Sequence, residues 1–464
     1  MTRPRAFLNL LIAIAFSASL VSNAQHRTAD AEFTMALTGD SIITRKLSVY
    51  DEAEYLQMIE LIRSADVAFT NLEVLFHDYE AYPMAESGGT WMRADPSLAN
   101  DLAWAGFDMV ARANNHSGDY GVLGMDLTTR HVAEAGIVQA GVGASLAEAR
   151  EAKFLETPRA RVALISIASS FANHMRAGRS RDNVPPRPGL NPLRYETTYV
   201  MPQAEFESLR ETGESLGQFI DMDGNSRGTD DDKPGEMEAF GRNFAIGQEH
   251  VIRMQANQDD VSEISAVVNN ASRLADFTIV TIHAHEYDGR RDKSPEFLHL
   301  FARAMIEAGA DVFVGHGPHV LRGIEIYQGK PILYSLGNFI FQNETLLRLP
   351  YDNYADFDLD DNSHVADFNR ERYENDTKGF PVLQENWESV IAVPTFSGGK
   401  LTQLALYPID LAYGAPPQVR GRPLLARREI ADRIIAYLQH LSNPYGTRIE
   451  NRRGIGYVDL SAAD

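Results

Sequence analysis

Short apolar runs and amphipathic stretches alternate along most of the chain. The apolar runs predict strands at residues 33–38, 67–71, 109–113, 162–168, 277–282 and 311–314. Stretches in which apolar residues recur every three or four positions predict helices at 54–64, 96–105, 128–135, 260–274 and 295–308. This alternation is typical of α/β proteins, which bind their ligands at the carboxyl ends of the strands.

Two segments interrupt the alternation. Residues 171–249 are rich in Pro, Gly, Arg and Asp, and residues 342–388 are acidic and rich in Asn and Asp. We interpret 171–249 and 345–388 as long insertions, because structureless segments of this length are usually lids or disordered. Beyond them, 389–394 and 399–408 predict a hairpin and 429–441 predicts a helix, so that 389–464 completes a domain formed mainly by 33–344.

Residues 1–24 have the features of a signal peptide. Arg3 and Arg5 precede an almost entirely apolar stretch at 6–20, and Ser22 and Ala24 provide the small side chains expected at a cleavage site. This predicts export to the periplasm or the cell exterior. An uncleaved membrane anchor is the alternative, although the apolar stretch is shorter than the roughly 20 residues that span a bilayer.

Composition narrows the possible chemistry. The 464 residues include no cysteine, which excludes disulfides, thiolate nucleophiles and Cys-bound zinc. Lys and Arg number 43 against 64 Asp and Glu, and the resulting charge of −21 argues against nucleic acid as a partner. Arginines nevertheless cluster at 176–194. We expect Arg176 and Arg179 to bind an anionic substrate, the alternative being that they pair with neighbouring acids.

Three polar motifs follow predicted strands in the first part of the chain. Gly39-Asp40-Ser41 and Asn71-Leu72-Glu73 each place a carboxylate after an apolar run, which by itself is typical of a turn or a helix cap. Asn114-Asn115-His116 places two amides and an imidazole in a row. Because an unpaired buried polar group costs about 1–3 kcal/mol, these side chains need partners.

Two histidine motifs, His283-Ala284-His285-Glu286 and Gly315-His316-Gly317-Pro318-His319, follow later apolar strands. A lone histidine is usually structural, but two pairs at strand ends indicate a metal site. The residue types suit Mn²⁺, Fe or Zn²⁺, and so many ligands exceed the needs of one tetrahedral zinc, which predicts two divalent ions. Because imidazoles bind metal only when neutral, affinity is expected to fall below about pH 6.5. The expected ligands are Asp40, Glu73, Asn115, His283, His316 and His319.

The order of these motifs, followed by Tyr334-Ser335-Leu336-Gly337-Asn338-Phe339, resembles the poly-gamma-glutamate capsule biosynthesis protein CapA family over residues 33–344. That family resembles the calcineurin-like metallophosphatases. The resemblance implies a four-layer αββα sandwich with a dimetal site at the strand ends, here with two long insertions and a C-terminal hairpin plus helix.

The resemblance also implies roles for individual residues. Glu73 stands where the metallophosphatases have a bridging Asp, and His116 matches their catalytic histidine. Ile42 departs from the pattern, because the superfamily has a metal-binding histidine there. His285 often corresponds to glycine in the family, and it is expected to be an added metal ligand or to contact substrate, as Asn338 is expected to do. The remaining matches are metal ligands: Asp40, Asn115, His283, His316 and His319.

Two classes of function remain open. The first is a metal-dependent hydrolase that cleaves an anionic phosphoester or glutamyl polymer, with His116 protonating the leaving group. The second is a non-catalytic accessory protein that binds an anionic capsule polymer during synthesis or export, within a capsule-synthesis complex at the membrane. Fold resemblance alone does not decide between them. Metal-dependent turnover by the purified protein separates the two classes.

Overall fold

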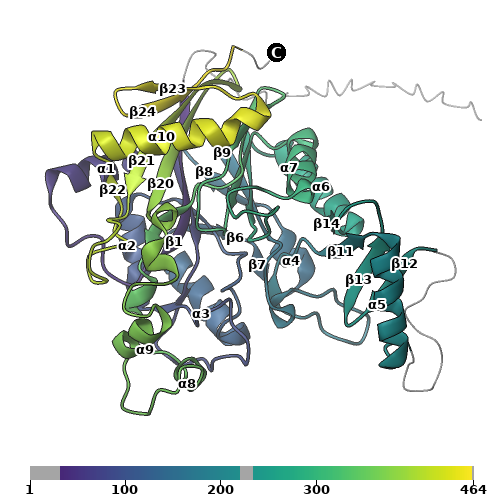
Figure 1. Ribbon diagram of the computed structural model, residues 1–464. Helices are drawn as coiled ribbons and strands as arrows, with labels where there is room; N and C mark the ends of the chain where they lie inside the picture. The colour runs from purple at the N-terminus through teal and green to yellow at the C-terminus, as the bar shows by residue number, and fades with distance from the viewer. Residues whose placement is uncertain (1–31, 220–233, 462–464) are drawn as a thin grey trace, which may run out of the picture.

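The structure is a computed structural model that describes residues 32–219 and 234–461 (Figure 1). The predicted signal peptide at 1–24 lies outside these residues. Strands and helices are mixed throughout, which confirms the predicted α/β class. In the part of the chain that the structure describes, none of the helices is long and apolar enough to cross a membrane.

A ten-stranded sheet combines four strands from the N-terminal part of the chain with β19 and the strands of the C-terminal part. Its strand order is β23-β24-β21-β20-β1-β2-β5-β6, with β19 beside β1 and β22 beside β21. The strands β19, β1, β2, β5 and β6 run parallel, and β20 and β21 form the predicted hairpin. The strands are β1 (Phe33–Ile42), β2 (Val67–Leu72), β5 (Met109–Ala111), β6 (Val138–Ala140), β19 (Asn338–Phe341), β20 (Glu388–Ser397), β21 (Lys400–Asp410), β22 (Leu424–Leu425), β23 (Ile449–Arg452) and β24 (Ile455–Val458).

A six-stranded sheet with the order β17-β18-β16-β15-β9-β8 contains the strands that precede the histidine motifs. Its central strands β9, β15, β16 and β18 are parallel, and the register of β15 and β16 places His283 beside His316. The strands are β8 (Lys153–Glu156), β9 (Arg161–Ala168), β15 (Phe277–His283), β16 (Val312–His316), β17 (Ile324–Tyr327) and β18 (Lys330–Leu333).

The two sheets pack against each other through a shared apolar core. Leu37 and Phe69 of the larger sheet contact the same cluster as Leu164 of the smaller one. The rings of Phe33 and Phe277 stack between the sheets with centroids 4.5 Å apart. Burying each large apolar side chain contributes about 1.5–3 kcal/mol, so this core holds the two sets of strand ends in a fixed relation.

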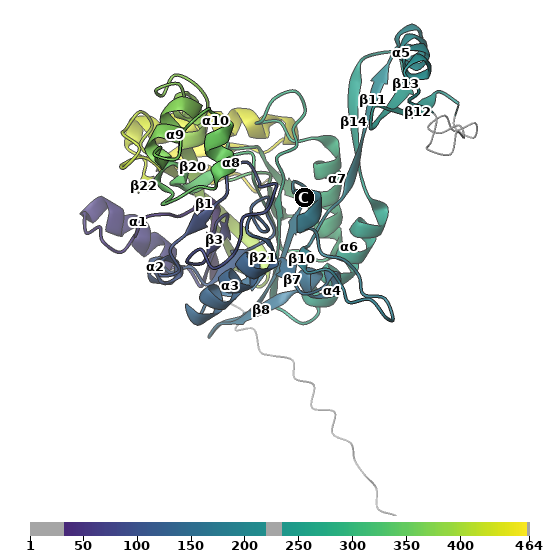
Figure 2. The same cartoon turned by 90° about the horizontal axis from the view of Figure 1, so that it is seen from below.

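Helices cover the outer faces of both sheets (Figures 1 and 2). The helices α1 (Ala53–Arg63) and α2 (Leu98–Ala105) pack on the ten-stranded sheet, and α6 (Gln258–Ser272) and α7 (Glu296–Ala308) pack on the six-stranded sheet. The helix α10 (Arg428–Ser442) joins the core between the sheets through Ile434 and Leu438. The sheets are thereby fixed from outside as well as from between.

One predicted helix is longer in the structure than the sequence pattern indicated. We predicted a helix at 128–135, whereas α3 spans Gly121–Glu134. Its first turn contains Gly121 and Gly124, which are poor helix formers and hide the start of the periodicity. Both glycines are needed locally, because Gly121 has a φ of +61° and a Cβ on Gly124 would lie 2.6 Å from the Cβ of Tyr120.

The two segments expected to be irregular contain regular structure. The first forms much of a separate four-stranded sheet, β12-β13-β11-β14, which projects from the body together with one helix (Figure 2). Four of the six residues of its edge strand β14 are exposed, and Arg253 and Gln255 interrupt the apolar residues of this strand, so it lacks the continuous apolar run that would predict a strand. The elements are β11 (Tyr195–Met201), α5 (Gln203–Ser215), β12 (Glu236–Ala239), β13 (Arg242–Ile246) and β14 (Val251–Ala256).

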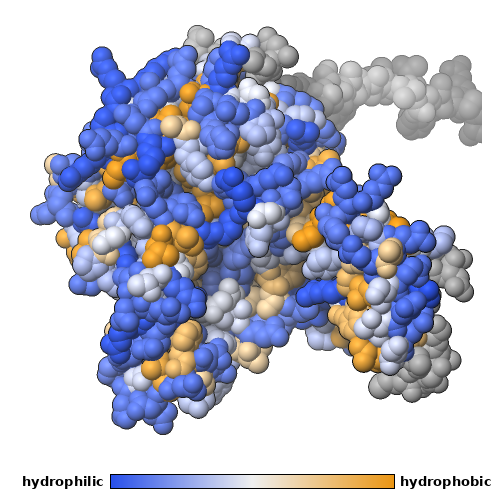
Figure 3. Space-filling model, viewed as in Figure 1, coloured by the Kyte–Doolittle hydropathy of each residue, from blue (hydrophilic) through white to orange (hydrophobic). Residues whose placement is uncertain are grey.

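The second segment consists of short helices that form a lobe beside the main body. Figure 3 shows a hollow between this lobe and the arm that carries α5. The lobe contains α8 (Tyr351–Ala355) and α9 (Val365–Arg372), with 3-10 turns at Asn343–Thr345, Phe380–Val382 and Gln384–Trp387. The remaining short elements are β3 (Leu75–Phe76), β4 (Arg93–Ala94), β7 (Val142–Gly143), β10 (Gly189–Leu190), α4 (Leu146–Arg150) and the 3-10 turns at Asn173–Met175 and Asn443–Tyr445.

Candidate metal centre

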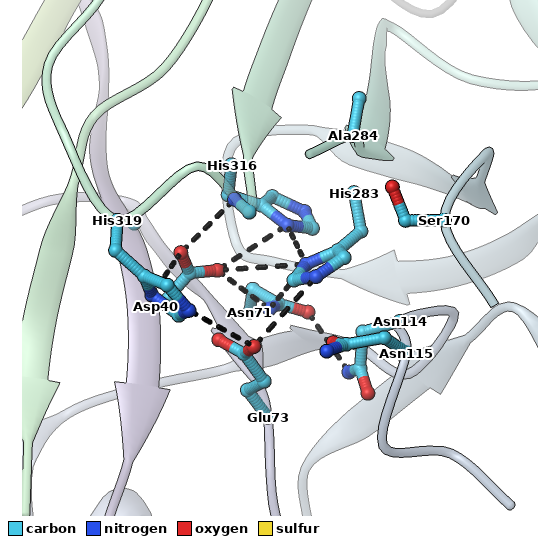
Figure 4. Close-up of polar contacts among 12 residues, drawn as sticks. Asp40, Asn71, Glu73, Asn114, Asn115, Ser170, His283, Ala284, His316 and His319 are labelled. Carbon is cyan, nitrogen blue, oxygen red and sulfur yellow. Dashed lines mark hydrogen bonds and ion pairs between the residues drawn. The ribbon is translucent and has the colours of Figure 1, made fainter. Parts of the chain in front are cut away.

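The polar motifs meet where the carboxyl ends of β1, β2, β15 and β16 come together (Figure 4). Asp40 on β1 lies beside Asn71 on β2 and Asn338 on β19. Gly39 allows this approach, because a Cβ there would lie 1.8 Å from the carbonyl oxygen of Gly337. Any larger residue at position 39 would push the first carboxylate away from the other strand ends.

One candidate ligand group contains Asp40, His283 and His316, whose ligand atoms all lie within 4.8 Å of one another. The Asp40 Oδ1 atom lies 3.5 Å from His316 Nδ1 and 3.7 Å from His283 Nδ1. The Thr281 hydroxyl lies 2.7 Å from His316 Nε2, and the Gly317 N–H donates to Asp40 Oδ2 at 3.0 Å. These outer contacts hold the imidazole and the carboxylate so that their free lone pairs face each other.

A second candidate group contains Glu73, His285 and His319. Glu73 Oε1 lies 4.0 Å from His319 Nε2 and 3.6 Å from His283 Nε2, so this carboxylate lies between the two groups. The imidazoles of His283 and His285 lie side by side, with their Nε2 atoms 3.0 Å apart. Asn338 Oδ1 lies 2.8 Å from His319 Nδ1, which leaves His319 Nε2 to face the centre.

Several buried oxygen atoms of the site lack the hydrogen-bond partners that a metal ion would replace. Both carboxylate oxygens of Glu73 and the side-chain oxygen of Asn115 are buried and have no hydrogen-bond partner among the described residues. The amide of Asn115 is fixed, because its Nδ2 donates to the carbonyl of Gly88 at 2.8 Å. Such acceptors cost about 1–3 kcal/mol each when left unsatisfied, and a cation satisfies several together. The side chains present are therefore compatible with metal binding.

Burial keeps the histidines of the site neutral, as metal binding requires, but it also favours protonation of the two carboxyl groups. It raises the pKa of Asp40 and raises that of Glu73 well above its usual range, with the charge of Asp40 adding to the second effect. It lowers the pKa of His316 to about 3 and also lowers the pKa values of His283 and His319. The imidazoles are therefore neutral and free to act as metal ligands. The two carboxyl groups have no positive charge beside them, so they hold a proton more readily until a cation binds.

We expect the carboxylates, rather than the imidazoles, to set the pH dependence of metal binding. Since the pKa of Glu73 is raised in the metal-free protein, a proton must leave when metal binds, and lowering the pH weakens binding. Calorimetric titration with Mn²⁺ at about pH 5.5 and about pH 7.5, in buffers of different ionisation enthalpy, counts the released protons. Equal affinity at both values and no proton release would contradict this expectation.

His116 lies at the edge of the two ligand groups and has its own carboxylate partner. Its Nδ1 is 2.7 Å from Asp119 Oδ2, and its Nε2 is 4.0 Å from Glu73 Oε1. Asp119 is held in turn by backbone N–H groups of Gly88 and Met92. Asp119 was not predicted from the sequence, although a carboxylate three residues after the histidine was available as a signal.

A cavity of about 370 Å³ opens above the candidate ligands. Asn115, His116, His285 and His319 line it, whereas Asn338 supports His319 from behind. His285, expected to be an added metal ligand or to contact substrate, is thus a candidate ligand that also lines the cavity. Two arginines that the sequence analysis did not select, Arg291 and Arg372, line the same cavity.

The arginines that were selected from the sequence lie elsewhere. Neither Arg176 nor Arg179 is among the residues that line the cavity. Arg179 is exposed and forms an ion pair with Glu263 on α6, and Arg176 bridges to Leu190 of β10 through its backbone. The pairing of Arg179 matches the alternative weighed for this cluster, in which arginines pair with neighbouring acids.

Comparisons with known proteins agree with the motif order. The family model for the bacterial capsule synthesis protein PGA_cap matches residues 34–343. The uncharacterized protein y4sH of Sinorhizobium fredii is 39% identical over 446 residues, which cover 92% of this chain and 93% of that protein. The capsule biosynthesis protein CapA of Bacillus anthracis is 23% identical over 329 residues, 69% of this chain and 62% of that protein.

A probable polyglutamine synthesis accessory protein of Mycobacterium tuberculosis is 26% identical over 233 residues, which cover 50% of this chain and 44% of that protein. The family model covers most of the chain and includes every candidate ligand. The resemblance expected from the motifs is therefore confirmed, and the chain belongs to the bacterial capsule synthesis family PGA_cap.

Proposed function

We propose that this protein is a metal-dependent hydrolase that acts on an anionic substrate in capsule or poly-gamma-glutamate biosynthesis. The observation that carries the proposal is the cavity: His285 and His319 of the second candidate ligand group line it together with His116, whose imidazole is paired with Asp119. A site that only bound a polymer would have no need of a buried imidazole oriented by a carboxylate. The pair is the arrangement that proton transfer requires.

The residues of the chain have separable tasks in this proposal. Asp40, His283 and His316 hold one divalent ion, and Glu73, His285 and His319 hold a second, with Asn115 as a further oxygen ligand. Mn²⁺, Fe or Zn²⁺ in these places supplies Lewis-acid polarisation and an activated water. Asp119 fixes Nδ1 of His116, so that Nε2 faces the cavity and can donate a proton to the leaving group.

The finer fold assignment is part of the same proposal. We infer a metallophosphatase-like four-layer sandwich, supported by the two packed sheets and the helices on their outer faces. The chain departs from that pattern at Ile42, which lines the cavity where the superfamily has a histidine. His285 offers a replacement imidazole for the second group.

Turnover by the purified protein tests the proposal. After removal of metal and reconstitution with Mn²⁺, Fe²⁺ or Zn²⁺, we expect hydrolysis within a panel of phosphoesters and γ-glutamyl amides, lost with chelator and restored by metal. Binding of polyglutamate without hydrolysis of any substrate, at full metal occupancy, would instead favour an accessory role. One relative is named for such a role.

We further propose that the protein acts after export, in the periplasm or outside the cell, with residues 1–24 as its signal peptide or membrane anchor. Such a location would let it meet a capsule-synthesis complex at the membrane. Support comes from the basic and apolar pattern of the first residues and from the capsule-associated relatives.

A further inference from the structure

We propose that Arg372 and Arg291 form a subsite for a second, non-reacting carboxylate of the substrate. This inference rests on the proposed function, because it names the substrate class of the same cavity. It identifies that class as an acyl compound with a free carboxylate close to the bond that is cleaved, as in a γ-glutamyl amide. Arg372 stands at the end of α9, and Arg291 lies in the loop after β15.

The charge of the cavity wall is opposite to that of the chain. Although the protein carries a formal charge of −21, no Asp or Glu is among the residues that line the cavity in the described part of the chain. The two charged residues of the wall are the arginines. The acids of the site, Asp40 and Glu73, are fully buried and are the residues that a metal would neutralise. The wall therefore attracts anions in addition to any group bound at the metals.

Arg372 is held in place without an acidic partner. It ends α9, its guanidinium lies against the rings of Phe368 and Tyr373, and its Nη1 donates to the hydroxyl of Thr90. Among the described residues, no carboxylate lies within ion-pair distance of it, in contrast to Arg370 two positions earlier, which pairs with Asp367. A half-buried, oriented and unpaired guanidinium is a preformed site for a carboxylate.

Arg291 is fixed through its backbone and retains unused donors. Its carbonyl accepts from Arg322 Nε at 2.9 Å, and Arg322 is buried and also donates to the carbonyl of Glu286. Within the described residues, the only carboxylate that its side chain contacts is that of Glu385, whose Oε1 lies 3.3 Å from Arg291 Nη2. The fork of Arg291 can therefore turn to a ligand that approaches from the cavity.

Other parts of the wall favour an amide-bearing aliphatic ligand. Phe341, Phe380 and Tyr287 supply an apolar surface suited to methylene groups. Asn343 also lines the cavity; its Nδ2 donates to the hydroxyl of Tyr373, and among the described residues its side-chain oxygen has no hydrogen-bond partner. A ligand N–H would satisfy this oxygen. A γ-glutamyl amide provides the methylenes, the N–H and the free carboxylate together, whereas a simple phosphoester lacks the N–H.

Ligand binding to the metal-loaded protein tests the subsite without relying on turnover. The probes are N-acetylglutamate and N-acetylisoglutamine, in which an amide replaces the α-carboxylate, so that the two differ only in the carboxylate assigned to the subsite. We expect the acid to bind at least about 10-fold more tightly than the amide, and Arg372→Gln and Arg291→Gln each to remove most of this preference while metal content stays unchanged. Arg179→Gln is the matched control, because that arginine is exposed and paired outside the cavity.

The outcomes separate this inference from the proposed function. Unchanged preference for the acid in both arginine variants overturns the subsite, whether or not the protein is a hydrolase. Arginine-dependent binding with no hydrolysis of any γ-glutamyl amide supports the subsite and overturns the hydrolase. If the α-amide of N-acetylphosphoserine, which has no carboxylate, binds as tightly as N-acetylglutamate with the same arginine dependence, the assignment to carboxylates is wrong.

In the case of an active enzyme, the subsite predicts a specific kinetic pattern. Arg372→Gln should raise KM for a γ-glutamyl amide at least about 10-fold with little change in kcat, because the arginine contacts a group that does not react. Amidating the free carboxylate of that substrate should cost the wild type a similar factor and cost the variant almost nothing. Equal losses in both proteins would contradict the assignment.

Discussion

Replacing Glu73 with Gln is expected to abolish tight metal binding at both ion positions. The Glu73 side chain is fully buried and lies between the two ligand groups, and neither of its oxygens has a hydrogen-bond partner among the described residues. Its negative charge is therefore the one best placed to serve both ions. Removing an oriented outer partner of a metal ligand already costs up to about 100-fold in affinity, and loss of a shared charged ligand should cost more. Elemental analysis after dialysis measures the result.

The variant should nevertheless stay folded. Gln has the shape of Glu and replaces a buried carboxyl group whose pKa is raised by desolvation. The Tm of the metal-free protein should therefore not fall. Wild-type protein should gain stability with added Mn²⁺, whereas the variant should not. Glu325→Gln is the control, since that buried carboxylate is bonded to Tyr334 and Arg303 outside the site.

A second variant separates a shared ligand from an unshared one. His316→Asn removes a ligand from the group of Asp40 and His283 only, and we expect it to lose one ion and keep the other. Retention of full metal content by the Glu73 variant, or loss of both ions from the His316 variant alone, would show that the division into two groups is wrong.

Replacing His116 with Gln is expected to lower kcat by about 10²–10⁴-fold while metal content remains unchanged. The imidazole faces the cavity, its Nδ1 is held by Asp119, and it belongs to neither candidate ligand group. The loss should be largest for substrates with poor leaving groups, because these depend most on proton donation. Steady-state kinetics across a series of leaving groups measures this dependence.

Two further variants define the role of the imidazole. Asp119→Asn should retain His116 but release its orientation, and its kcat should fall less than in the His116 variant. His131→Asn, on α3 and paired with Glu134, should behave as wild type. If the His116 variant loses metal in proportion to activity, the residue is a ligand and not a proton donor.

Much of the fold follows from local patterns in the sequence. The central strands β2 and β15 are largely apolar runs because both of their faces are covered, and α7 shows the periodicity of one buried face. The arm formed by β11 to β14 was not predicted, because its edge strand β14 is mostly exposed and lacks a continuous apolar run. The lobe with α8 and α9 was not predicted, because its helices are short and polar.

The residues of the candidate site were also identifiable in part. Asp40, Glu73 and the histidines stand directly after apolar strands, where chemistry is expected in parallel sheets. Their division into two groups was not visible, because it depends on the register of β15 with β16 and on how the two sheets pack. For His285 the sequence left open a metal ligand or a substrate contact, and only the packed loops place it beside Glu73 and His319.

The sequence by itself therefore determined the fold class, the family and the side chains that could bind metal, because these follow from local residue patterns, short motifs and the order of the motifs along the chain. The tertiary structure decided which arginines face the cavity. Arg372 and Arg291 are 81 positions apart in the sequence and reach the same wall through the fold of the lobe and the loop fixed by Arg322. Arg179, within the conspicuous basic cluster, is instead bound to Glu263. Long-range packing selects which charges meet, and no local pattern encodes it.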